Sequence, residues 1–184
     1  MSCRVTRQER ILEVRNRPLV IWLVGQLHSD PPGSGREDPR AALAARGHQI
    51  LSLPAEGPLA SRLASERPDA IHVRSLPVLA SLANRPGRRR LPPIVVGCNP
   101  ADSLARPAAR FLRSDAVDRI LVPDESTKIH LIRDAGIDPH KIDIVPTPDS
   151  ARLEGLYREA AEYKAIRRRE IVPQSIKLSE RDEG

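Results

Sequence analysis

Short apolar segments recur along the chain, each followed by polar turn residues and a stretch with helical spacing. The first, at residues 19–24, is a continuous apolar run of the kind found in parallel strands that are buried on both faces. The full pattern predicts strands at residues 19–24, 49–53, 70–73, 93–98, 118–122 and 141–145. It predicts helices between them at residues 39–46, 58–66, 76–84, 105–115 and 126–135.

Strands that alternate with helices across short loops are typical of parallel βαβ units. Right-handed crossovers then place helices on both faces of the sheet. We therefore predict an α/β fold with a doubly wound, mostly parallel, Rossmann-like sheet over residues 18–149. The polar, basic residues 1–17 form a separate N-terminal arm in this division.

The pattern changes at Ser150, where apolar residues recur at the spacing of a single amphipathic helix. This spacing predicts a helix over residues 150–170, followed by an extended, charged tail to residue 184. We assign residues 150–184 to a C-terminal extension.

Composition limits the class of protein. The chain has 184 residues, enough for one domain with short additions, and 40% of them are apolar, although only four are aromatic. No apolar run approaches the ~20 residues that span a bilayer. Two cysteines fit neither a disulfide framework nor a metal site, so a cytoplasmic protein with reduced thiols is expected.

The net charge is +6, with 26 arginines and 4 lysines. This excess fits either a GC-rich genome or an anionic partner.

Three segments together resemble a known family. PPGSG at residues 31–35 is followed by ALAARGHQI, residues 69–75 read DAIHVRS, and residues 118–145 read DRILVPDESTKIHLIRDAGIDPHKIDIV. In this order they resemble "LA.RGHEV", "DVVHVHS" and "ADRVIVPSESTRRDLIRAGIDPEKIRVV" of GT-B-type glycosyltransferases of family four. The resemblance covers residues 18–148 and matches the N-terminal, acceptor-side domain.

The resemblance implies a domain that binds the acceptor and faces a second domain that binds the sugar nucleotide. After Val145 this sequence departs from the family, and we expect a truncated form without the donor domain. We therefore expect a non-catalytic structural or interaction subunit that needs no cofactor and does not bind sugar nucleotide by itself. The alternative is the acceptor-binding half of a split glycosyltransferase, completed by a separate donor-domain chain.

The candidate ligand residues lie in turns or at the ends of predicted strands, where open α/β sheets bind ligands. They are Gly33, Ser34, Gly35, His72, Asn99 and Ser126. Each also has a structural interpretation: a strand-to-helix turn, a buried histidine, or a helix N-cap at Ser126. No histidine pair has the spacing of a zinc site, so no metal is expected.

Docking to a partner is expected at the N-terminal arm and the C-terminal extension. The residues proposed for it are Leu153, Leu156, Tyr157, Tyr163, Arg167, Arg168 and Arg169. A protein partner is the first expectation. Peripheral association of this cytoplasmic protein with an anionic membrane surface is the second. Aromatic residues are not interleaved with the arginine clusters, which argues against nucleic acid. Deleting residues 151–184 is expected to abolish complex formation and leave the sheet folded.

Overall fold

The structure is a computed structural model that describes residues 17–25, 39–54, 59–87, 91–98, 106–146 and 150–170. Residues 1–16 of the predicted arm and residues 171–184 of the predicted tail lie outside this part of the chain.

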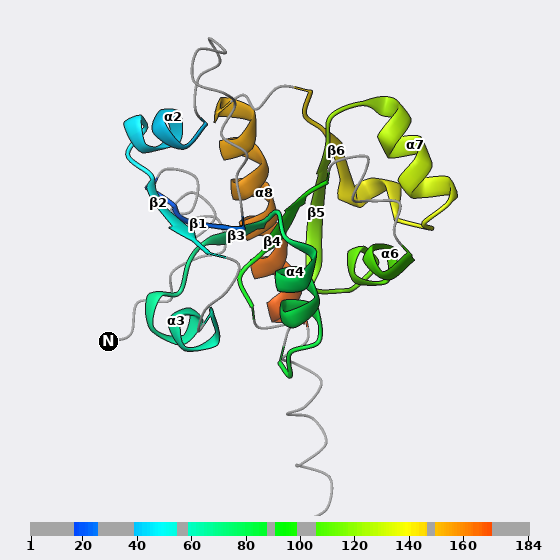
Figure 1. Ribbon diagram of the computed structural model, residues 1–184. Coiled ribbons are helices and arrows are strands. Elements are labelled where there is room, and N and C mark those ends of the chain that lie inside the picture. The colour runs from blue at the N-terminus through cyan, green and yellow to red at the C-terminus, as the bar shows by residue number, and fades with distance from the viewer. Residues whose placement is uncertain are drawn as a thin grey trace, which may run out of the picture.

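A six-stranded sheet forms the centre of the molecule (Figure 1). Its strands are β1 (Val20–Val24), β2 (Gln49–Leu53), β3 (Ala70–Val73), β4 (Ile94–Gly97), β5 (Val117–Val122) and β6 (Ile142–Ile144). They pair in the order β2-β1-β3-β4-β5-β6, and every pair is parallel. The predicted α/β class with a parallel, Rossmann-like sheet is confirmed, and each strand lies where the apolar pattern placed it.

The helices also follow the sequence pattern. They are α2 (Pro39–Ala45), α3 (Leu59–Glu66), α4 (Leu76–Ala83), α6 (Arg106–Leu112), α7 (Glu125–Arg133) and α8 (Ser150–Glu170). A short 3₁₀ turn, Pro139–Lys141, precedes β6 and was not predicted.

The N-cap of α7 differs from the expectation. Asp124, not Ser126, caps this helix, because its Oδ1 accepts hydrogen bonds from the Thr127 backbone N–H at 2.7 Å and from Thr127 Oγ1 at 2.9 Å. These hydrogen bonds, the backbone one first, hold the pKa of Asp124 below its ordinary value. An ionised side chain at this position also complements the positive end of the helix dipole.

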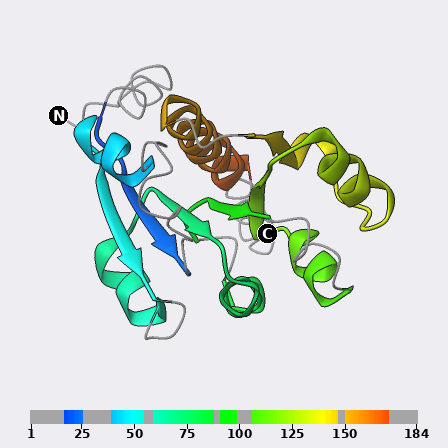
Figure 2. The ribbon, with the colours of Figure 1, turned by 45° about the horizontal axis from the view of Figure 1, so that its top comes forward.

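Helices cover both faces of the sheet, and each face has its own apolar core (Figure 2). Side chains from α3, α4, α6 and α7 pack on one face, against strand residues such as Trp22, Ile71 and Ile120. Side chains from α2 and α8 pack on the other face, against residues such as Ile21 and Val95. Neighbouring residues of each strand therefore belong to different cores, which explains the continuous apolar runs in the sequence.

The long helix α8 is part of this layered fold. Leu153, Leu156, Tyr157 and Ala160 are buried in the second core. Removing residues 151–184 would therefore expose the apolar side chains on that face of the sheet. The expectation that this deletion leaves the sheet folded does not agree with the structure.

Candidate functional site at the carboxyl edge of the sheet

The order of the strands reverses between β1 and β3. From β1 the chain moves outward to β2, and it then crosses to the other side of β1 to form β3. In open α/β sheets, ligands bind outside the carboxyl ends of the strands at this switch point. The neighbouring strand ends, those of β1, β3 and β4, define the candidate site.

At the switch point the ends of β1 and β3 lie in close contact. Gly25 follows β1 with φ of +105°, a backbone conformation that favours glycine. A Cβ atom at this position would lie 3.0 Å from Ser75 Cβ. Gly25 therefore permits both the turn and the close approach of the segment that follows β3.

His72 lies on β3, next to Leu23 of β1 and Val95 of β4. Its side chain is 9% exposed, and Nδ1 lies 2.7 Å from the hydroxyl oxygen of Tyr157, with which it shares a hydrogen bond. Burial, assisted by the charge of Arg74, lowers the pKa of His72 to about 3. Burial likewise raises the pKa of Tyr157. The pair is therefore neutral at physiological pH and connects α8 to the sheet.

Gly97, at the end of β4, provides space for two side chains of β3 and its following loop. A Cβ atom there would lie 3.0 Å from His72 Nε2 and 3.4 Å from Arg74 Cγ. Arg74 passes over this glycine and is exposed. His72 Nε2 is buried and has no hydrogen-bond partner within the described ranges. At this edge the exposed Arg74 carries a positive charge, whereas His72 is enclosed.

Of the other predicted ligand residues, Ser126 alone lies in the described part of the chain, and it does not join this cluster. Gly33, Ser34, Gly35 and Asn99 lie outside the described residues. Ser126 is exposed in the first turn of α7, where it is not the cap. His72 is the one predicted ligand residue that the structure places at the switch point.

The residues proposed for docking fall into three groups. Leu153, Leu156 and Tyr157 are buried in the core of this chain, so they stabilise its own fold and are not open to a partner. Tyr163 is 49% exposed. The side chains of residues 167–169 lie outside the described part, although their backbone continues α8.

Two polar connections between α8 and the sheet were not predicted. Lys164 Nζ lies 2.7 Å from Asp118 Oδ2 and donates to the carbonyl oxygen of Pro92 at 3.1 Å. Both charged side chains are less than a tenth exposed. The sequence contains a signal for this contact, because Lys164 lies four residues after Ala160, on the apolar side of the helix. A charge at such a position requires a buried partner.

The second connection is centred on Glu154, near the start of α8. Its Oε2 lies 2.9 Å from Arg46 Nη1 and 3.3 Å from His48 Nε2, and Oε1 accepts from Arg158 Nε at 2.9 Å. Partial burial opposes ionisation of Glu154, but hydrogen bonds from Arg158, His48 and Arg46 outweigh it and keep the pKa below its ordinary value. His48 Nδ1 in turn accepts from the Leu19 backbone N–H at 3.1 Å.

Within the described ranges, no group of three or more His, Cys, Asp or Glu residues is placed to hold a metal ion. None of the helices in this part of the chain is long and apolar enough to cross a membrane.

Comparison with known proteins adds one match. The model of the family described as Glycosyltransferase Family 4 matches residues 17–148, well over half of the chain. The match includes all six strands and ends just before α8. It confirms the resemblance stated for residues 18–148. No curated protein and no solved structure matches the chain.

Proposed function

Because the chain belongs to glycosyltransferase family 4, we propose that it acts as a non-catalytic domain of this family and serves as a structural or interaction subunit of a larger assembly. The observation that supports this function is the state of His72. A general base must reach the reacting proton and have a pKa near the working pH. His72 is enclosed against Tyr157, and its pKa is about 3. It stabilises the contact between α8 and the sheet and is not accessible to a substrate.

The exposed side of α8 is the surface that we assign to the partner. Tyr163 and Ile166 are 49% and 37% exposed, and they lie three residues apart, so they share one side of the helix. Large exposed apolar side chains that lie together mark interaction surfaces more often than isolated ones do. This surface belongs to the C-terminal extension in which docking was predicted.

Substitutions on this surface test the proposal better than deletion, because α8 is needed for folding. The tagged full chain would be used to isolate partners from native extract, with mass spectrometry to identify them. The Tyr163→Ser/Ile166→Ser variant is expected to lose the captured protein by at least about tenfold, or about 1.4 kcal/mol. The matched control is Ile129→Ser, because Ile129 is 51% exposed on α7.

A protein that is recovered equally by the wild type, the double variant and the control would contradict the assigned surface. Recovery of no partner by the wild-type chain would contradict the subunit function itself. Circular dichroism of each variant shows whether the fold is retained.

A second function, the acceptor-binding half of a split glycosyltransferase, is favoured by Arg74. Its exposed guanidinium lies at the switch point, where it can bind an anionic group of an acceptor. A separate donor-domain chain would then complete the enzyme. With such a chain identified, Arg74→Ala should reduce sugar transfer by the reconstituted pair by about tenfold or more. Transfer at the wild-type rate would exclude this function of Arg74.

A further inference from the structure

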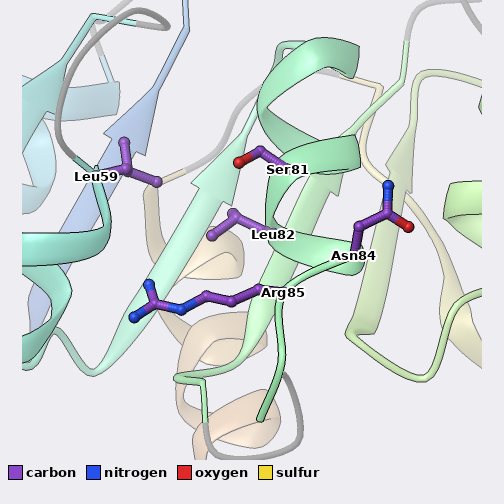
Figure 3. Close-up of a pocket in the computed structure, with 5 residues that line it drawn as sticks. All are labelled: Leu59, Ser81, Leu82, Asn84 and Arg85. Atoms are coloured by element: carbon purple, nitrogen blue, oxygen red, sulfur yellow. The ribbon is translucent and has the colours of Figure 1, made fainter.

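A groove lies between α3 and α4, on the face of the sheet opposite α8. Its volume is about 430 Å³, and its lining residues are Leu59, Ser81, Leu82, Asn84 and Arg85. Figure 3 shows the side chains of Leu59, Ser81, Leu82 and Arg85 on the same side of α4, whereas the amide of Asn84 points away. The groove is therefore separate from the exposed side of α8.

Arg85 supplies the charge of this groove. It follows Asn84, the C-cap of α4, and its backbone N–H donates to the carbonyl oxygen of Leu82 at 3.3 Å. Its side chain extends from the end of α4 toward α3 (Figure 3). The residue is half-buried, and Nη1 is fully buried without a hydrogen-bond partner in the described structure. Leaving a buried, charged N–H group without an acceptor is costly, so this atom requires a partner.

No carboxylate in the described ranges supplies that partner. Glu66, on the facing helix α3, accepts from Arg62 Nε through Oε1 at 2.8 Å, and its Oε2 is buried and likewise has no hydrogen-bond partner in the described structure. Six other arginines of the described structure have a carboxylate within 4.0 Å, namely Arg17, Arg46, Arg62, Arg119, Arg133 and Arg158. Arg85 differs from these six because it combines a buried donor and a neighbouring groove with the lack of an ion pair within the described ranges.

We propose that this groove binds a small organic anion whose carboxylate or phosphate oxygens accept hydrogen bonds from Arg85. The planar guanidinium can donate two parallel hydrogen bonds to either group. Leu59 and Leu82 provide apolar contacts for the body of the ligand, and the Ser81 hydroxyl is a further donor at the rim. A few polar groups in an otherwise apolar concave site are typical of small-molecule sites. The inference does not depend on the function proposed for α8.

The test uses the full ¹⁵N-labelled chain at low ionic strength, with amide chemical shifts as the readout. Three titrations are compared: inorganic phosphate, benzoate, and chloride as the control for ionic strength. Saturable shifts confined to α3, α4 and Arg85 are expected with phosphate, with benzoate or with both. Stronger binding of benzoate identifies a carboxylate ligand with an apolar body, and stronger binding of phosphate identifies a phosphate ester.

Two variants test the part played by Arg85. Arg85→Gln removes the charge and should weaken binding of the better probe by at least about tenfold, equivalent to about 1.4 kcal/mol. Leu59→Glu places a carboxylate in the groove and should abolish binding even if Arg85→Gln does not fold. The matched control is Arg133→Gln on α7, where the arginine is exposed and paired with Asp134, and its affinity should equal that of the wild type.

Three results would overturn the proposal. The first is an affinity that neither Arg85→Gln nor Leu59→Glu changes. The second is a set of shifts that chloride reproduces, because this would show general screening of charge. The third is the lack of saturable shifts with both probes, which would show that water alone satisfies Arg85.

Discussion

The two faces of the sheet are covered in different ways. On one face, α3, α4 and α6 each connect two consecutive strands, and α7 does the same together with the short 3₁₀ turn. On the other face, the long helix α8 begins after the last strand and packs beside α2 against β1, β3, β4 and β5. Short connections at both ends determine where each of the four helices lies. Within the described residues, no strand follows α8.

The difference appears in the polar contacts. On the face covered by α3 and α7, side-chain contacts such as Arg62–Glu66 and Asp124–Thr127 join residues of the same helix or its cap, although Arg62 also lies over the Trp22 ring of β1. The contacts of α8 reach distant segments, as in Tyr157–His72 and Lys164–Asp118. Apolar burial stabilises α8 but is non-directional. The comparison therefore indicates that specific polar pairs help to determine the position of α8 on the sheet.

Removing the ring of Tyr157 should have the largest effect on the α8 face. Tyr157→Ala leaves a cavity beneath α8 and deprives His72 of its hydrogen-bond partner, so we expect a loss of about 3–5 kcal/mol in the free energy of unfolding. Urea denaturation followed by circular dichroism measures it. Hydrogen exchange should show that the amides of α8 lose protection more than those of α7.

Two further variants separate the ring from its hydroxyl group. Tyr157→Phe keeps the packing and should cost only about 1–2 kcal/mol. Tyr163→Ala changes an exposed ring on the same helix and should cost less than about 1 kcal/mol. Equal losses for Tyr157→Ala and Tyr163→Ala would contradict the view that Tyr157 connects α8 to the sheet.

The elements of the fold could be predicted because their signals are local. The central strands β1, β3 and β4 are buried on both faces, so runs such as residues 19–24 are continuously apolar. Glycine or proline follows α2, α3, α4 and α7 within three residues, although not α6. The cap of α7 was assigned wrongly because Asp124 and Ser126 are both good caps. Where β5 ends in the folded sheet determines which of the two residues caps α7. This depends on the tertiary structure and not on the local sequence.

The site could be predicted only in part, because its contacts join distant segments. His72 was expected at a strand end, but nothing local indicates that Tyr157, 85 residues later, encloses it. The apolar spacing of Leu153, Leu156 and Tyr157 fits equally a helix that packs on its own sheet and one that binds a partner. The sequence analysis assigned these residues to partner docking, whereas their burial in the structure shows that they pack on the sheet of this chain.

The buried pair Lys164–Asp118 allows a direct comparison of the two faces. Lys164→Ala leaves the Asp118 carboxylate buried without its counter-ion, and we expect a loss of about 3–5 kcal/mol in the free energy of unfolding. The matched pair on the other face is Arg62–Glu66, which is partly exposed and lies within one helix turn. Arg62→Ala should therefore cost only about 0.5 kcal/mol through the ion pair, although its contact with the Trp22 ring adds a further small loss.

A double variant distinguishes buried charge from lost packing. Lys164→Met together with Asp118→Asn leaves no charge in the buried site and should recover part of the stability lost in Lys164→Ala. Denaturant unfolding of these three variants and of the wild type measures the cost of the buried charge and the cost of the lost packing. If Lys164→Ala and Arg62→Ala reduced the free energy of unfolding by similar amounts, the buried ion pair of α8 would contribute no more to stability than the partly exposed pair on α3.

The dependence of the free energy of unfolding on pH tests whether His72 is enclosed. The expected effect is a small difference in slope between two proteins. Its pKa is about 3 in the folded chain, against an ordinary value of 6.5. Between these values the unfolded state binds more protons, so the free energy of unfolding should decrease as the pH falls, by up to about 1.4 kcal/mol per pH unit. His72→Asn cannot titrate there and should show a shallower slope between about pH 6 and pH 4. Carboxylates such as Asp124 contribute equally to both proteins, so the difference between the two slopes isolates the imidazole. Identical slopes would mean that His72 is open to protonation in the folded chain, which would restore it as a ligand-contacting residue at the switch point.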